Sequence, residues 1–109
     1  MKIVKVRTQK NYSEASNHVL VGYVVEYNEI FVKLNCKSFH YKAPTLEQDQ
    51  VVEGEIGERV IPWLNVECIN VLSDDFDWRN AVLDKCDDGI CLKHKDDSTL
   101  ISRFRTSHR

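Results

Sequence analysis

Two stretches rich in β-branched and aromatic residues dominate this chain: VLVGYVVEYNEIFVKL over residues 19–34 and RVIPWLNVECI over residues 59–69. Residues of these types favour strands. The first stretch has Gly22 near its centre, which indicates a sharp bend or a close approach of another backbone. The second stretch has Pro62, which must end a strand or lie at a sheet edge. Both stretches therefore predict short, strongly bent strands.

The residues that follow Tyr27 predict a turn and then a long strand. Asn28 tolerates positive φ, so a tight turn is expected there. Apolar and polar residues then alternate from Ile30 to Lys37, which is typical of a strand with one apolar face. The apolar parity switches before Phe39, and a bulge near Ser38 would explain the switch and curve the strand.

Taken together, residues 19–72 predict five short strands in a small, strongly bent barrel, closed or nearly closed. Residues 1–18 predict a strand followed by a short helix or a loop. Residues 73–94 begin with acidic residues that suit a helix, and Trp78, Val82 and Cys86 would lie on one face of that helix. Asp88-Gly89 also suits a hairpin turn, so both remain open. Residues 95–109 lack periodicity and predict a flexible tail. The expected fold is mainly β with a short C-terminal helical or hairpin extension.

The length of 109 residues favours a single domain, and a domain this small gains stability by pairing with other copies. No apolar run approaches the roughly 20 residues that cross a bilayer. The N-terminal residues lack the apolar segment of a secretory signal. These features predict a cytoplasmic protein with no membrane partner.

The charge of the chain is unevenly distributed. Residues 1–43 carry seven Lys or Arg and three Glu, a net charge of +4, whereas residues 44–102 carry five basic and 14 acidic residues, a net charge of −9. The pI near 6.1 argues against a dedicated nucleic-acid binder. The asymmetry still leaves room for a basic face, or for ordinary solvated strand faces, at Lys2, Lys5, Arg7, Lys10, Lys33, Lys37 and Lys42.

The four cysteines predict no disulfide framework, because reduced thiols are expected where no secretion signal is seen. Cys36 and Cys68 are expected to be small buried residues. Cys86, Cys91 and His94 are close in sequence, but structural zinc needs four ligands and usually paired Cys-x2-Cys or His-x3-His spacings. No metal site is predicted.

No catalytic motif is present in the sequence. The four histidines are His18, His40, His94 and His108, and none pairs visibly with a nucleophile and an acid. A chain with four glycines shows no Gly-rich phosphate loop. We expect a non-enzymatic protein without a cofactor.

The two stretches resemble the Sm-like (LSm) family, whose members are small bent five-stranded barrels that assemble into rings and commonly bind RNA. The first motif of the family is matched by Leu20, Gly22, Val24, Tyr27, Asn28, Phe31, Val32 and Leu34. The second motif is matched by Val60, Ile61, Leu64, Asn65, Val66, Cys68 and Ile69. The resemblance covers residues 19–72, and other SH3-like barrels share similar spacing.

The resemblance implies a nucleic-acid site that departs from the family pattern. Val32 replaces the base-reading Asn, and Pro62 replaces the Arg. Phe31 keeps the position on which a base stacks, and Lys33 would counter phosphate. The candidate nucleic-acid-binding residues are Phe31, Lys33, Lys37 and Trp63. Packing of the aromatics into a subunit or intradomain contact is the alternative.

Two functions therefore stay open. The first is a homo-oligomeric ring that pairs strand edges near residues 59–61 and 66–71 and binds RNA or other single-stranded nucleic acid. The second is an SH3-like protein-interaction or scaffold barrel that binds no nucleic acid. The missing Asn and Arg and the acidic second half favour the second function.

Overall fold

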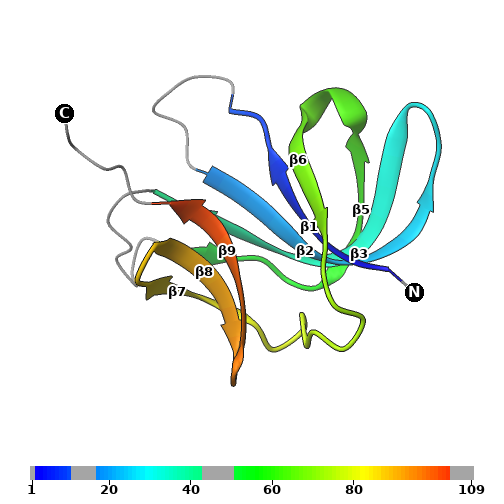
Figure 1. Cartoon of the computed structure of the whole chain (residues 1–109). Coiled ribbons are helices and arrows are strands. Elements are labelled where there is room, and N and C mark those ends of the chain that lie inside the picture. The colour runs from blue at the N-terminus through cyan, green and yellow to red at the C-terminus, as the bar shows by residue number, and fades with distance from the viewer. Residues whose placement is uncertain (1, 11–16, 43–50, 104–109) are drawn as a thin grey trace.

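The structure is a computed structural model that describes residues 2–10, 17–42 and 51–103 (Figure 1). Most of these residues form antiparallel strands, so the expectation of a mainly β fold is confirmed. The short helix considered within residues 1–18 falls on residues 11–16, which lie outside the described residues.

The strands form two sheets. The first is a six-stranded sheet in the order β4-β3-β2-β1-β6, with β5 also paired to β3. Its strands are β1 (Ile3–Thr8), β2 (Asn17–Tyr27), β3 (Phe31–Tyr41), β4 (Val52–Glu53), β5 (Gly57–Pro62) and β6 (Val66–Val71), and a 3-10 helix, η2 (Trp63–Asn65), joins β5 to β6. The second sheet has the order β7-β8-β9 and consists of β7 (Val82–Cys86), β8 (Gly89–His94) and β9 (Asp97–Arg103).

The bend predicted at Gly22 is present as a close backbone approach. Gly22 lies opposite Cys36 on β3, and a Cβ at this glycine would lie 2.0 Å from the backbone oxygen of Asn35. Only a residue without a side chain fits there. In Figure 1 the hairpin of β2 and β3 curls over toward β5, which gives the sheet its half-barrel shape. The turn at Asn28 is also confirmed, because its Oδ1 accepts the N–H groups of Ile30 at 2.8 Å and Phe31 at 3.0 Å.

The bulge expected near Ser38 is wrong. The register of β2 and β3 is regular from Asn17↔Tyr41 to Val24↔Leu34 and shifts only between Val24 and Glu26, so the irregularity lies in β2. The apolar parity of β3 changes for a different reason. One face of the strand is buried near its start and the opposite face near its end, because different parts of the molecule cover them.

The two faces of the β1–β2–β3 sheet carry separate cores. The inner face of the half-barrel holds Val4, Val6, Leu20, Val32, Leu34, Cys36 and Ile61. The outer face packs against the second sheet and the segment before it through Ile3, Val19, Val21, Phe39, Tyr41, Phe76, Trp78, Ala81, Leu83, Ile90 and Leu92. A sheet buried on both faces needs apolar residues at both parities, which a simple alternating pattern does not reveal.

The closed five-stranded barrel is also wrong, because the sheet has six strands and stays open. Within the described ranges no ladder joins β5 to β6, and these two strands lie on opposite sides of the opening. The helix η2 bridges the gap instead. The N–H of Trp63 donates to Ile30 O at 2.9 Å, while the N–H of Gln9 donates to Asn65 O at 2.8 Å. One end of η2 is thus held by the β2–β3 hairpin and the other by the end of β1.

The C-terminal extension is a hairpin, and the helix alternative is wrong. Residues 87 and 88 form the turn, and β7 pairs with β8. Leu83 is buried opposite Leu92, whereas Val82 is 49% exposed. The segment forms a strand and not the helix that the spacing of Trp78, Val82 and Cys86 suggested, because a hairpin can bury Leu83 against the first sheet.

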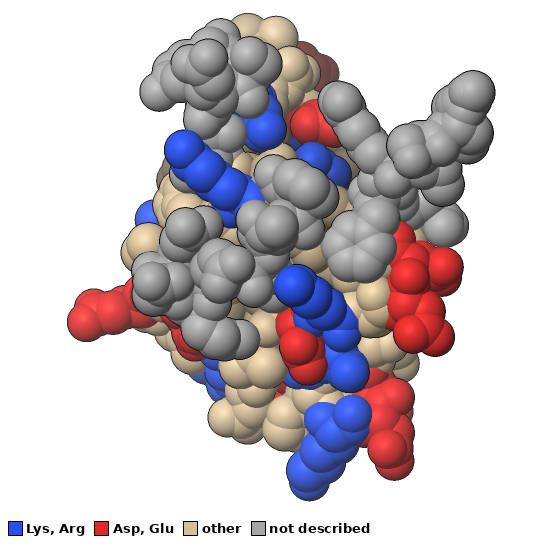
Figure 2. Space-filling model, turned by 90° about the vertical axis from the view of Figure 1, so that its left-hand side faces the viewer, with Lys and Arg blue, Asp and Glu red and all other residues tan. Residues whose placement is uncertain are grey.

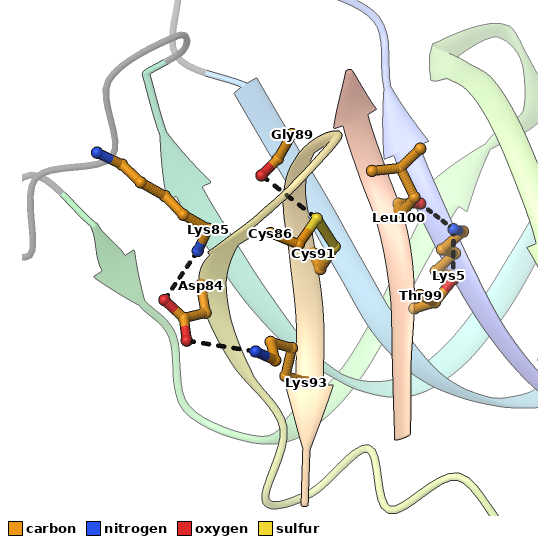
Figure 3. The surroundings of a disulfide bond; sticks show 9 residues. All are labelled: Lys5, Asp84, Lys85, Cys86, Gly89, Cys91, Lys93, Thr99 and Leu100. Carbon is orange, nitrogen blue, oxygen red and sulfur yellow. Dashed lines mark hydrogen bonds and ion pairs between the residues drawn. A yellow bond between two sulfur atoms is a disulfide. The ribbon is translucent and has the colours of Figure 1, made fainter. Parts of the chain in front are cut away.

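Two cysteines that were expected to be reduced are joined in the same hairpin. Cys86 and Cys91 form a disulfide, and the Cys86 sulfur lies 3.4 Å from Gly89 O (Figure 3). Strand pairing places Cys86 opposite Gly89 and so brings the two sulfurs together, which corrects the expectation of free thiols. Cys36 is a free buried thiol as expected, but Cys68 is exposed on β6.

Residues 97–103 form β9, where the sequence predicted a flexible tail; residues 104–109 lie outside the described ranges. Side chains of β1 hold this strand by its backbone. Lys5 Nζ donates to Leu100 O and to Thr99 Oγ1, the latter at 2.6 Å (Figure 3). Arg7 donates to Ile101 O at 3.3 Å. Contacts to backbone carbonyls leave no periodic signature in the sequence of β9.

In the part of the chain that the structure describes, no helix has the length and apolar character needed to cross a membrane.

Candidate functional site

The structure brings Phe31 and Trp63 to the same end of the half-barrel. Phe31 begins β3 opposite Pro62 and is half-buried. Trp63 begins η2, and its Nε1 donates to Asn28 O at 2.6 Å. Its ring packs partly against the inner core. The indole of Trp63 is therefore anchored in the fold, while Phe31 keeps a partly accessible ring at the rim.

Lys33 lies close to Phe31 on the same face of β3, but its charge is balanced. Its Nζ is 3.4 Å from a Glu58 carboxylate oxygen and 3.9 Å from one of Glu26. Both carboxylates are largely exposed, so these ion pairs are weak and can exchange for another anion.

Lys37 does not join this group. It is only 6% exposed, and its Nζ lies 2.7 Å from Glu53 and donates to the backbone oxygens of Arg79 at 3.0 Å and Ala81 at 2.9 Å. These three contacts use the three donors of the ammonium group. Lys37 thus attaches β3 to the segment that leads into β7, and it is not available to phosphate.

Acidic and basic side chains are mixed on the side of the molecule seen in Figure 2. In its lower half, Lys and Arg side chains lie next to Asp and Glu side chains. The net charges of the two halves of the sequence therefore do not appear as separate basic and acidic areas on this face.

A cleft lies where the half-barrel stays open. It has a volume of about 710 Å³ and opens between β5 and the end of β1, beside η2. The apolar residues that line it are Leu20, Val60, Ile61 and Pro62, of which Leu20 and Ile61 are buried. The polar residues that line it are Thr8, Gln9, Lys10, His18, His40 and Arg59, together with Asn65. These residues continue the inner face of the half-barrel, which changes from apolar to polar at this end.

Two histidines stack inside the cleft. His18 on β2 and His40 on β3 are direct cross-strand partners, and their ring centroids are 4.1 Å apart with planes 8° from parallel. His18 Nδ1 lies 3.2 Å from Thr8 Oγ1, whereas His18 Nε2 is buried and has no hydrogen-bond partner within the described residues. An unpartnered buried polar atom is rare in folded proteins.

The electrostatics of the cleft keep His18 neutral. Burial lowers its pKa to about 4, and electrostatic repulsion by His40 and Arg59 acts in the same direction. Burial raises the pKa of the Cys36 thiol to about 11, against the opposing influence of Arg59. At neutral pH Cys36 is therefore a protonated thiol and not a nucleophile.

The lining of the cleft is basic. Lys10 and Arg59 are exposed cations, and the described lining residues include no carboxylate. A cleft whose lining combines buried apolar residues with cationic side chains is suited to bind an organic anion. The described lining therefore offers groups that can recognise an anion.

The sequence interpretation treated His18 and His40 as scattered histidines. A signal was present, because the two residues lie at nearly equal distances on either side of the turn at Asn28. A regular hairpin there places them opposite each other. Arg59 and Lys10 could not have been assigned to this site from the sequence, since their proximity depends on how β5 and β1 approach across the open side.

No family model, curated protein or solved structure matches this chain. What the protein does is therefore inferred from its own residues.

Proposed function

We propose that this protein is a non-enzymatic, Sm-like module that assembles with other copies through its sheet edges and binds single-stranded nucleic acid at the Phe31 rim. The observation that carries the assembly is the pair of edges at the opening of the half-barrel. Strand β5 pairs only with β3, and β6 pairs only with β1, in the described part of the chain. Each strand therefore offers backbone groups that another chain can pair with.

Exposed apolar side chains accompany these edges. Val60 on β5 is 56% exposed, and Val71 on β6 is 62% exposed. Leu64 in η2, between the two strands, is 89% exposed. Edges of monomeric proteins are usually blunted by charges or covered, so apolar side chains along both edges favour pairing with a partner. The arrangement agrees with the edge pairing that the Sm-like resemblance implies.

Light scattering at increasing protein concentration tests the assembly. Wild type is expected to exceed the mass of one chain, and Val71→Lys is expected to shift it toward the monomer, because a charge on an edge opposes pairing. Val25→Lys, which places the same charge on an exposed position of β2, is the control and should leave the mass unchanged. A wild-type monomer at every concentration would exclude self-assembly.

The nucleic-acid part of the proposal rests on Phe31 and Lys33. Stacking of a base on an aromatic ring contributes about 1–3 kcal/mol. We expect Phe31→Ala to weaken binding of single-stranded RNA at low salt by about five- to 100-fold. Tyr27→Ala removes an exposed aromatic from the adjoining strand and serves as the control. Equal affinities of wild type and Phe31→Ala would remove Phe31 from this role.

A second candidate is an SH3-like protein-interaction module without nucleic-acid binding. It is favoured by the burial of Lys37 and by the two carboxylates that already balance Lys33. A salt series separates the two candidates. RNA binding that depends on phosphate contacts weakens steeply with added salt. Absence of RNA binding at low salt would leave the protein-interaction module.

A further inference from the structure

The cleft beside His18 and His40 opens on the side of the half-barrel where β5 and β6 diverge, and Val60 of the β5 edge is one of its lining residues. His40 lies near the end of β3 that is far from Phe31, whereas Pro62, the cross-strand partner of Phe31, also lines the cleft. Its volume of about 710 Å³ falls within the range of sites that enclose a small organic molecule, roughly 300–1,000 Å³. An inorganic anion alone would fill a small part of it.

The charge of the lining selects an anion. The chain as a whole has a net charge of −2, yet Lys10 and Arg59 meet at this cleft and its described lining carries no carboxylate. A guanidinium group matches the geometry of a phosphate with two parallel hydrogen bonds. Arg59 is exposed and faces the inner side of the half-barrel, so it is placed to bind a phosphate at the mouth.

The interior of the cleft suits a flat ring. Imidazole rings are among the side chains on which nucleobases stack, and the exposed His40 lies flat against His18. Leu20 and Ile61 are buried apolar residues of its lining. The unpartnered Nε2 of His18 provides one hydrogen-bonding atom for the edge of a base. A phosphate site, a stacking surface and a buried polar atom therefore occur in one cavity.

We propose that this cleft binds a nucleoside monophosphate, with the phosphate on Arg59 and Lys10 and the base against His40 and the buried apolar residues. The same chemistry could arrive as a free nucleotide or as the phosphorylated end of an RNA strand. The free nucleotide fits the cavity on its own, and the experiment separates the two sources. The proposal requires neither edge assembly nor Phe31, although Val60 of the β5 edge also lines the cleft.

Calorimetric titration of the full chain with AMP at low salt tests the site. Adenosine and inorganic phosphate are the comparison ligands, because adenosine has the base without the phosphate and inorganic phosphate has the phosphate without the base. AMP is expected to bind at least tenfold more tightly than either. Absence of AMP binding at millimolar concentration, or equal binding of AMP and adenosine, overturns the proposal.

Variants locate the binding. Arg59→Gln is expected to weaken AMP binding about tenfold or more and to leave adenosine binding unchanged, since a hydrogen-bonded charge is lost. Arg79→Gln changes an exposed arginine outside the cleft and should have no effect. His40→Ala should weaken AMP and adenosine alike. Thermal denaturation checks that each variant is folded. AMP binding that survives both cleft variants overturns the proposal.

Six-residue RNA strands with and without a 5′-phosphate distinguish the sources and keep this proposal separate from the proposed function. If both strands bind at less than a tenth of the affinity of AMP in competition with it, the ligand of the cleft is a free nucleotide. Stronger competition by the phosphorylated strand alone assigns the cleft to a strand end. RNA binding that is lost in Phe31→Ala, with AMP binding retained, places the two ligands at separate sites. RNA binding without any AMP binding overturns the cleft proposal and leaves the rim.

Discussion

The two faces of the β1–β2–β3 sheet are both apolar, but they are covered in different ways. The outer face is covered by a second sheet, and three cations of the first sheet, Lys5, Arg7 and Lys37, bond to backbone carbonyls of the covering segment. The inner face is covered by the bending of its own strands. The cover is complete over Val32 and Leu34 and ends where β5 and β6 diverge. The difference shows that an apolar face closed by curvature alone leaves an opening, and the candidate ligand site occupies it.

The largest effect is expected from the outer core. Phe39→Ala removes a ring with 0% exposure and should lower the free energy of unfolding by about 3–5 kcal/mol. Phe31→Ala, on the same face but beyond the second sheet, should cost clearly less because its ring is only half-buried. Urea denaturation monitors both variants. Equal losses would mean that the second sheet does not stabilise the outer face.

The curvature of the inner face is tested at Gly22. Gly22→Ala places a Cβ 2.0 Å from Asn35 O and should cost about 3 kcal/mol, because two backbones must separate. Gly57→Ala is the matched control, since nothing lies within 4 Å of its Cβ position. Its stability should change by less than about 0.5 kcal/mol. A well-tolerated alanine at Gly22 would contradict the close approach of β2 and β3.

The polar attachment of the second sheet is tested at Lys37. Lys37→Met keeps most of the apolar stem but leaves two backbone carbonyls without their donor, which should cost about 2 kcal/mol. Lys33→Met removes an ammonium on the same face of β3 that makes only exposed ion pairs, and should cost less than about 1 kcal/mol. Chemical denaturation of the two variants gives the comparison, and a larger loss at Lys33 would reverse it.

The smallest effect concerns the open end of the inner face. The pKa of His18 is about 4 in the folded protein and 6.5 in an unfolded chain, so between these values the unfolded chain binds the extra proton. Stability should therefore fall as the pH is lowered from 6.5 to 4. The loss should be about 1 kcal/mol, because solvent screens a half-exposed ring. Denaturation measured as a function of pH should show this loss of stability in His40→Gln but not in His18→Gln.

Local chemistry predicted much of the fold. Gly22, Asn28 and Pro62 were correctly placed at a close approach, a turn and a strand end, because each depends on the residue itself. The bulge near Ser38 and the helix near Trp78 were wrong for a shared reason. Both depended on which face is buried, and that is set by the second sheet.

The candidate site was less accessible to sequence reasoning. Phe31 and Trp63 were both candidate residues, and short connections bring them to the same end of the half-barrel. The role of Lys37 is decided by carbonyls more than 40 residues away in the chain, at Arg79 and Ala81. The cleft likewise unites the end of β1 with β5, and no local pattern records that approach.

The two edges of the opening have a geometric consequence for any assembly. One edge is β5 and the other is β6, so a contact that joins them is head-to-tail and leaves an unused edge at each end. Copies then keep adding until the rotation from one copy to the next completes a full circle. A change in the tilt between neighbouring copies, such as one introduced in η2, would turn a closed particle into an open helical filament.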